Sequence, residues 1–295
     1  QMLLKECQGE AELNSLRAIA VGSREEEPES LFVRSSLELG RSTRLPQIRF
    51  FLTEDDEHSY AFIIECSFET IILIHNNNNH KHNEAVLSST LNELFDMLAQ
   101  SITGAVYIYT EDDAEDEVAR KFINQRFANV KYGIEECETF YMKDAQMKAV
   151  NEMSFALPEG LHFDEISLET DLETMHRTWD GGERDIDYVR TMIEHRPSSC
   201  IRDSATGRAV AWELCEPFGF VAHLYVLPEY QGQRLGCTVE LHTCQKMIRK
   251  GVRPYKYVLT SNESVVRGTR KHAMWTEWTR NEQPHITNFV YFKPK

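Results

Sequence analysis

Residues 221–250 have the sequence VAHLYVLPEYQGQRLGCTVELHTCQKMIRK, in which three patterns follow one another. An apolar run predicts a strand over Phe220–Leu227, and amphipathic spacing predicts a helix over Gly236–Lys250 that Gly251 closes. The loop between these elements contains glycine, so its backbone is able to approach a ligand closely. Its N–H groups converge, and the helix start adds about half a positive charge. We therefore expect a phosphate-bearing ligand at this loop.

The loop differs from the two commonest phosphate motifs. A P-loop ends in Gly-Lys-Ser/Thr, and a dinucleotide fingerprint needs a third glycine within a parallel βαβ unit. Here the strand before the loop follows a predicted hairpin, with strands at Ser199–Arg202 and Ala209–Cys215 joined by the turn Asp203–Gly207. The sequence therefore predicts a mixed, largely antiparallel sheet.

The loop resembles the pyrophosphate loop of the GNAT superfamily of CoA-dependent N-acyltransferases, which has the form Gln/Arg-x-x-Gly-x-Gly/Ala after the fourth strand. Gln231 and Gly236 match this form, and Arg234 stands at the middle glycine. Outside the loop the chain is similar to the glycine N-acyltransferase branch, and the resemblance covers Ser198 to about Ala273. The residues that carry this further similarity are Trp212-Glu213-Leu214, Gly219, Leu227-Pro228-Glu229-Tyr230 and Ser261-Asn262-Glu263.

The resemblance implies a site for acyl-CoA or acetyl-CoA between two splayed strands, without a metal. The pantetheine would pair with the backbone of Leu224, Tyr225, Val226 and Leu227. The pyrophosphate would lie on Gln231, Gly232, Gln233, Arg234, Leu235, Gly236 and Cys237, and Asn262 would touch the thiol arm, cap the following helix, or do both. Basic residues would supply positive surroundings, although each also suits an ordinary solvated face: Lys246, Arg249, Lys250, Lys256, Arg267, Arg270 and Lys271.

Acyl transfer to an amine needs a base, donors for the developing oxyanion and a proton for the leaving thiolate. In the glycine N-acyltransferases a glutamate follows the strand-opening glycine, and here Phe220 stands at that position. Three residues remain as candidate bases, directly or through a water: Glu213, Glu216 and His223. The tyrosine that the family often uses as thiolate acid is also absent from residues 263–274. The resemblance therefore implies cofactor binding more strongly than it implies a particular catalytic residue.

The first half of the chain repeats the order of predicted elements found in the second. The second half continues with a strand at Lys256–Thr260, a helix after Asn262 and a strand at Asn288–Lys293. We interpret the repeat as a duplication, with two unrelated α/β domains of similar order as the alternative. The prediction is an α/β fold of two tandem GNAT-like domains, a degenerate one over residues 1–150 without a cofactor site and an acyl-CoA-binding one over residues 151–295. The elements expected in the first half are a helix at Leu3–Val21, strands at Ile48–Leu52, Tyr60–Cys66 and Thr70–His75, a helix at Glu84–Gln100, a strand at Ala105–Tyr109, a helix at Ala114–Phe127 and a strand at Thr139–Lys143.

Two other groups of residues have ordinary explanations. The run from His75 to His82 contains metal-ligand types, but its low complexity favours a polar loop, and without glycine it predicts no CoA site in the first half. Cys237 and Cys244 share a helical stripe with Leu241 and Ile248, which is typical of a core. Cys237 also stands at a helix start, where a thiol pKa can be lowered.

Composition narrows the function further. The 295 residues carry a formal charge of −15, which gives no general attraction to nucleic acid or to an anionic membrane. Seven scattered cysteines without a C-x-x-C pair predict an intracellular chain, cytoplasmic or mitochondrial. We expect an N-acyltransferase for a small primary amine or amino acid. The alternatives are a catalytically inactive CoA-binding or interaction protein, and an acetyltransferase for peptides or cationic amines.

Overall fold

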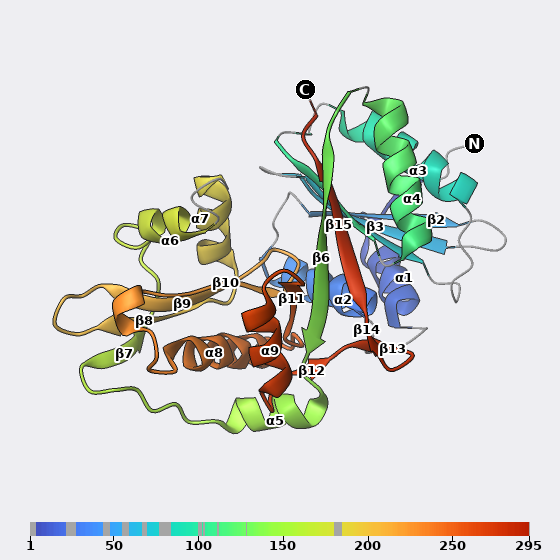
Figure 1. Ribbon diagram of the computed structural model, residues 1–295. Helices are drawn as coiled ribbons and strands as arrows, with labels where there is room; N and C mark the ends of the chain where they lie inside the picture. Colours follow the sequence, from blue (N-terminus) through green and yellow to red (C-terminus); the bar gives the residue numbers. More distant parts are fainter. Residues whose placement is uncertain are drawn as a thin grey trace. The chain divides into compact units, whose positions relative to one another are not determined.

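The computed structural model describes residues 4–21, 28–43, 48–54, 59–66, 70–76, 84–99, 102, 104–110, 112–127, 129–179 and 185–294 (Figure 1). The chain forms two compact units. Unit 1 contains Gln1–Thr139, Val258–Val266 and Trp278–Lys295, and unit 2 contains Phe140–Tyr257 and Arg267–Glu277. Among the described residues, no helix is both long enough and apolar enough to cross a bilayer.

Unit 1 contains most of a large mixed sheet, parts of which, residues 255–257 and 276–277 among them, fall in unit 2. Its strands follow the order β1-β2-β3-β4-β5-β15-β6-β11, with β12 paired to β6. The β4–β5 pair is parallel, whereas β1–β2, β2–β3, β3–β4, β5–β15 and β15–β6 are antiparallel. The strands are β1 (Leu4–Glu6), β2 (Ile48–Glu54), β3 (Ser59–Cys66), β4 (Thr70–Asn76), β5 (Val106–Thr110), β6 (Tyr132–Tyr141), β11 (Tyr255–Leu259), β12 (Thr276–Glu277) and β15 (Ile286–Phe292).

The helices of unit 1 follow the apolar spacing of the sequence. In α3 (Glu84–Leu98) the stripe Leu87, Leu91, Leu94 and Leu98 is fully buried, as its spacing predicts. This stripe joins one core cluster with Phe122 and the apolar residues of β5. The remaining helices are α1 (Glu10–Val21), α2 (Pro28–Thr43) and α4 (Asp113–Arg126).

The start of the chain differs from the predicted helix at Leu3–Val21. Residues Leu4–Glu6 form β1, which pairs with β2, and α1 begins only at Glu10. The Glu12 carboxylate accepts hydrogen bonds from the N–H groups of Gln8 and Gly9, which fixes the helix start there. Helix α2 was not predicted. Strand β6 begins at Tyr132, whereas the prediction began at Thr139, because the glutamates in the first part of the strand obscure its alternating pattern in the sequence.

The last strand has a different partner from the expected one. The sequence placed Asn288–Lys293 in the sheet of the second half, whereas β15 lies between β5 and β6 in unit 1. Its register runs from Asn288 opposite Thr110 to Phe292 opposite Val106, and the Phe292 ring contacts Phe95 and Phe127. The compact units therefore interleave in sequence instead of following each other at residue 150.

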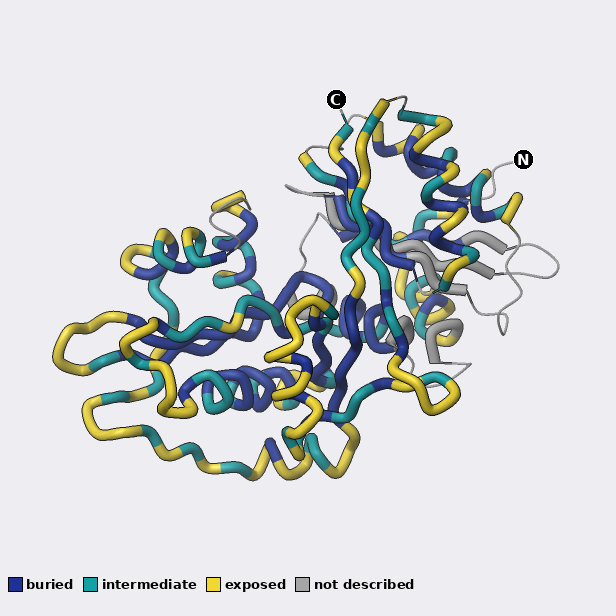
Figure 2. Tube along the Cα trace, in the orientation of Figure 1, coloured by how far each residue is buried: buried dark blue, intermediate teal, exposed yellow. Residues whose placement is uncertain are grey.

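Unit 2 contains a four-stranded antiparallel sheet of order β10-β9-β8-β7. Helix α8 (Leu235–Arg249) packs on β8 and β9, and β9 is buried along its whole length (Figure 2). The strands are β7 (Leu161–Asp164), β8 (Ser199–Asp203), β9 (Ala209–Cys215) and β10 (Val221–Val226). The other helices are α5 (Asp144–Glu152), α6 (Leu172–Thr178), α7 (Ile186–His195) and α9 (Glu263–Lys271), which runs through both units, and of these only α9 was predicted.

We predict that a fragment of residues 1–150 is much less stable than the full chain, because it lacks the strand between β5 and β6. A synthetic peptide of residues 283–295, added in trans, should raise the melting temperature of this fragment, as followed by circular dichroism. The same peptide with Phe292→Ala is the control, since losing a buried aromatic ring costs about 3–5 kcal/mol. A fragment that melts like the full chain and ignores the peptide would contradict the placement of β15.

Candidate functional site

Strand β10 has a hydrogen-bonded neighbour on one side only. It pairs with β9, and its other edge forms no ladder with any strand in the described part of the chain. Strand β11 belongs to the other sheet, although the Phe220 ring before β10 contacts Tyr255 and Tyr257 of β11 at centroid distances of 6.0 and 5.2 Å. The two strands are therefore close where β10 begins but are not paired, which leaves backbone N–H and C=O groups available along β10.

A β-bulge interrupts β10 in its middle. Ala222 lies opposite Leu214 and Tyr225 lies opposite Trp212, so His223 and Leu224 together face the single residue Glu213. His223 adopts a left-handed backbone conformation with φ of 61°. A bulge of this kind redirects the backbone N–H groups and side chains of an edge strand.

The predicted phosphate loop follows directly. After a short 3-10 turn at Pro228–Tyr230, residues 231–234 are exposed and lead into α8. The N–H groups of Gly232, Gln233 and Arg234 make no hydrogen bond to any described residue. The first turn of α8 contains no acidic residue, so nothing in that turn opposes an anion at its N-terminus.

Gly236 packs the start of α8 against β10. A Cβ built at this glycine would lie 3.4 Å from Val226 Cγ2 and 3.8 Å from Leu224 Cδ2. Gln231 Nε2 donates a hydrogen bond of 3.1 Å to the Val226 carbonyl oxygen, which ties the loop to the same strand. The structure therefore brings the predicted strand residues and the predicted loop residues together.

The other cofactor-site candidates have different surroundings. Leu224 is exposed, Leu227 is buried, and the Tyr225 ring stacks on Trp212. Cys237 Sγ lies 3.0 Å from His272 Nε2, and burial raises the pKa of this thiol, in contrast to the lowered value considered from the sequence. Asn262 precedes α9 in unit 1, where its carbonyl oxygen accepts the N–H groups of Val265 and Val266, so its contact with a thiol arm stays a prediction.

The expected positive surroundings form only in part. Lys256, Lys246 and Arg270 are held by acidic partners in ion pairs with Glu240, Glu165 and Glu277, respectively. Arg249 and Lys250 end α8 and lie about 20 Å along the helix from its start. Arg267 and Lys271 are exposed on α9. Arg234 is the cation that the loop itself supplies.

Arg234 occupies the N-cap of α8 in the left-handed conformation, with φ of 61° and ψ of 14°. Glycine adopts this conformation without cost, which explains why the resembled motif has glycine here. For a residue with a side chain the cost is about 1–2 kcal/mol. Arginine in place of glycine at position 234 therefore adds a positive charge at the start of α8 and strains the backbone of the loop.

Glu213 is enclosed between β9 and α8. Its side chain is 2% exposed, and Oε2 has no hydrogen-bond partner among the described residues. Burial, reinforced by the neighbouring Glu240 carboxylate, raises the pKa of Glu213 well above its usual range, and Lys256 opposes this only in part. The Glu213 carboxyl is therefore an enclosed core group rather than an accessible base.

The other two candidate bases lie on the opposite face of the sheet. Glu216 is buried and accepts a hydrogen bond from the Tyr188 hydroxyl of α7. The His223 ring stacks on Trp179, with centroids 4.6 Å apart and planes 9° apart, and lies 6.2 Å from the Trp212 ring. Since Trp212 and Glu213 are successive in β9, they point to opposite faces. The three candidates therefore do not meet at one point, and His223 is the least buried of them.

The sequence did not identify Trp179 and Tyr188 as neighbours of this face. Trp179 directly follows α6 and Tyr188 lies in α7, and the short apolar patterns of these two segments were not recognised as helices. The polar run from His75 to His82 lies outside the described residues from Asn77 onward. Within the described residues, no group of three or more His, Cys, Asp or Glu side chains is placed to hold a metal ion.

We predict that Glu213→Gln stabilises the folded chain more as pH rises. The pKa of the Glu213 carboxyl is higher in the folded chain than its usual value of 4.5. The carboxyl therefore contributes fully to the free energy of unfolding below about pH 4.5, and this contribution is lost as the pH rises toward the folded pKa. The difference in unfolding free energy between variant and wild type should grow as the pH rises above about 5, by up to about 1.4 kcal/mol per pH unit. Urea unfolding of both proteins measures it, with the exposed Glu159→Gln as control. Equal pH profiles for all three proteins would contradict the raised pKa.

Comparison with known proteins places this geometry in a known fold. No protein-family profile matches the chain, and no curated protein matches it. A Drosophila protein of a structural genomics programme is 13% identical, with a TM-score of 0.76 over 100% of this chain and 99% of that one. A GCN5-related N-acetyltransferase from Kribbella flavida is 13% identical, with a TM-score of 0.53 over 88% and 92%. A tandem GNAT protein from the clavulanic acid biosynthesis pathway is 11% identical, with a TM-score of 0.54 over 98% and 97%. The chain thus has the predicted α/β fold of two tandem GNAT-like domains, each a mixed, largely antiparallel sheet flanked by helices.

Proposed function

We propose that the chain is a CoA-dependent N-acyltransferase that moves an acyl group from acyl-CoA, or acetyl-CoA, to a small primary amine or amino acid. The observation that carries the proposal is the junction of an unpaired, bulged strand edge with an anion-ready helix start. Open N–H groups at residues 232–234, the start of α8 and the edge of β10 adjoin one another through Gly236. This combination suits a ligand with phosphates at one end and an extended amide-bearing arm at the other.

In this proposal each part of the junction has one task. The loop and the first turn of α8 bind the pyrophosphate, with Arg234 as an additional charge partner. The edge of β10 from Leu224 to Leu227 pairs with the pantetheine amides. Bound acyl-CoA supplies the thioester. Backbone N–H groups at the bulge are the nearest donors on β10 for the oxyanion of the tetrahedral intermediate.

Acyl transfer also needs a side chain that accepts the proton of the amine. The amine nitrogen forms a bond to the acyl carbon, the carbon–sulfur bond breaks, the amine loses a proton, and the thiolate gains one. Of the three candidate bases, His223 fits the first transfer best, because it stands on the bulge and histidine is the side chain that most often acts as a general base. Glu213 is enclosed in the core, where burial raises its pKa, and Glu216 accepts a hydrogen bond from Tyr188.

A non-catalytic acyl-CoA-binding protein is the second candidate. Phe220 occupies the place of the family glutamate and packs between the rings of Tyr255 and Tyr257, which makes that place apolar. The fold and the loop serve this function equally well, so activity has to be measured separately from binding. A closer relation to the glycine N-acyltransferase branch stays a proposal that rests on the matches around Trp212 and Asn262.

We predict that acetyl-CoA raises the melting temperature of the chain and that Gly236→Val abolishes most of this rise. A single methyl at residue 236 makes ordinary contact with Val226, so Gly236→Ala should keep its affinity within a few fold. A branched side chain would push α8 from β10 and weaken binding by roughly tenfold or more.

Gly268 of α9 is the matched control, because a Cβ there meets no atom within 4 Å. Gly268→Val should leave acetyl-CoA binding unchanged. A folded Gly236→Val variant that binds acetyl-CoA as the wild type does would exclude this junction as the cofactor site.

We predict further that His223→Gln lowers the rate of acyl transfer by roughly 100-fold while leaving acetyl-CoA affinity nearly unchanged. The matched control is His195→Gln at the end of α7, a histidine outside the proposed site. Phe220→Glu should raise turnover, because it returns a carboxylate to the position that the resembled enzymes use.

The acceptor panel for these assays contains small amines, amino acids, polyamines and peptides. A wild-type chain that binds acyl-CoA but acylates none of them would decide for the non-catalytic function. Turnover confined to peptides or polyamines would instead support the acetyltransferase alternative. Activity that survives His223→Gln would remove His223 as the base.

A further inference from the structure

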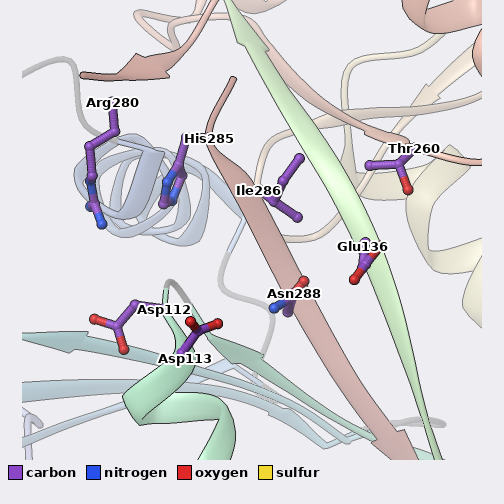
Figure 3. Close-up of a pocket in the computed structure, with 8 residues that line it drawn as sticks. All are labelled: Asp112, Asp113, Glu136, Thr260, Arg280, His285, Ile286 and Asn288. Carbon is purple, nitrogen blue, oxygen red and sulfur yellow. The ribbon is translucent and has the colours of Figure 1, made fainter. Parts of the chain in front are cut away.

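Unit 1 contains a polar pocket of about 340 Å³ that the proposed acyl transfer does not use (Figure 3). It lies at the N-terminal end of α4, beside β15 and β6, and all its lining residues belong to unit 1. This volume is at the lower end of the range for small-molecule sites, so it suits a small metabolite and not a molecule of the size of CoA.

Three carboxylates are among the residues that line the pocket. Asp112 and Asp113 come from the start of α4, and Glu136 comes from β6. Asp112 caps α4, and its Oδ1 accepts the N–H groups of Ala114 and Glu115. Asp113 and Glu136 are exposed, so both carboxylates are accessible to a cation. Three carboxylates around one cavity disfavour phosphates and favour a ligand that carries a positive charge.

Asn288 of β15 adds an acceptor whose direction is fixed. Its Nδ2 donates a hydrogen bond of 2.7 Å to Asp116 Oδ2, and because a carboxylate only accepts, the amide cannot be reversed. Its Oδ1 is shielded from solvent and has no hydrogen-bond partner among the described residues. An unsatisfied carbonyl oxygen of this kind is costly, and a donor group of a ligand would satisfy it.

The pocket is also lined by a cation. Arg280 stands on the hairpin of β13 (Thr279–Arg280) and β14 (Gln283–Pro284), and its guanidinium lies 5.3 Å from the centre of the Trp278 ring. Within the described part of the chain, Arg280 contacts the Trp278 ring but forms no ion pair. The buried ring of His285 contacts the same tryptophan at 4.4 Å. Arg280 is therefore available to bind a carboxylate of a ligand.

We propose that this pocket binds a small zwitterion, an α-amino acid, as a second ligand of the chain. The ammonium group is bound by the carboxylates of Asp113 and Glu136 and by Asn288 Oδ1. The carboxylate group is bound by Arg280. Both charges of the ligand are needed, because the pocket is lined by carboxylates and by a guanidinium. The proposal is independent of the acyl-CoA junction in unit 2 and stands or falls without it.

The test is isothermal titration of the full chain with each of the twenty standard amino acids at millimolar concentration. The best binder is then compared with its amine that lacks the carboxylate and with its acid that lacks the amino group. We expect saturable binding of the amino acid, at least tenfold weaker binding of both analogues, and a change in the fluorescence of Trp278 that Trp278→Phe removes.

Two variants locate the site. Arg280→Met keeps the aliphatic stem beside Trp278, and Glu136→Gln keeps the size of an exposed side chain; each should weaken binding by roughly tenfold or more. Lys131→Met and Glu117→Gln make the same charge changes on unit 1 away from the pocket and should leave binding unchanged. Absence of saturable binding by all twenty amino acids, equal binding of either analogue, or binding that both pocket variants leave intact would overturn the proposal. None of these outcomes bears on acetyl-CoA binding.

Discussion

The buried ion pair between Lys256 and Glu240 connects two parts of unit 2 that no strand pairing connects. Lys256 belongs to β11 and Glu240 to α8, and both side chains are at most 9% exposed. Trp275 Nε1 donates to the second oxygen of Glu240, and Lys256 Nζ lies 4.6 Å from the centre of the Trp275 ring. Gly236 then packs the start of the same helix on β10. Helix α8 thereby holds β10 and β11 as neighbours while their backbones stay unpaired, and that unpaired edge is what the proposed cofactor site requires.

Such a pair adds little net stability compared with an apolar pair of the same volume, but losing one partner leaves a buried charge and costs about 3–5 kcal/mol. The nearby Glu213 illustrates the cost of an unpaired buried charge. Its carboxyl has no cation of its own, and its pKa is raised. We therefore expect the ion pair to contribute mainly to the geometry of the unit. Its directional contacts restrict how α8 lies against β11 more than an apolar contact of the same size would.

The sequence was informative where structure depends on local pattern. Strand β9 was predicted to the residue, and β8, β10, α8, β11 and α9 were predicted within one or two residues, because alternation, helical spacing and turn residues are properties of short segments. The partner of β15 was not predictable in this way, since its pairing with β5 joins residues about 180 positions apart. The basic residues near the site illustrate the same limit. Lysine is a residue type that often binds phosphate, so the sequence suggested this role for Lys256. Its acidic partner Glu240 is adjacent only in the folded chain.

The two halves of the chain have a similar order of elements but differ in one strand pair and in the residue before one helix. In unit 1, β4 and β5 are paired in parallel from Thr70 opposite Val106 to Leu73 opposite Tyr109, whereas the corresponding β10 and β11 form no ladder. Asp112 caps the following helix in the first half, and Asn262 directly precedes the following helix in the second, each two positions after a threonine. Both side chains are able to cap a helix, but only the aspartate carries a charge. In the proposed amino-acid pocket Asp112 joins Asp113 and Glu136, and together they favour a cation. The closed β4–β5 pair leaves no open strand edge beside that pocket, so the two proposed ligands would use different features of two halves with a similar order of elements.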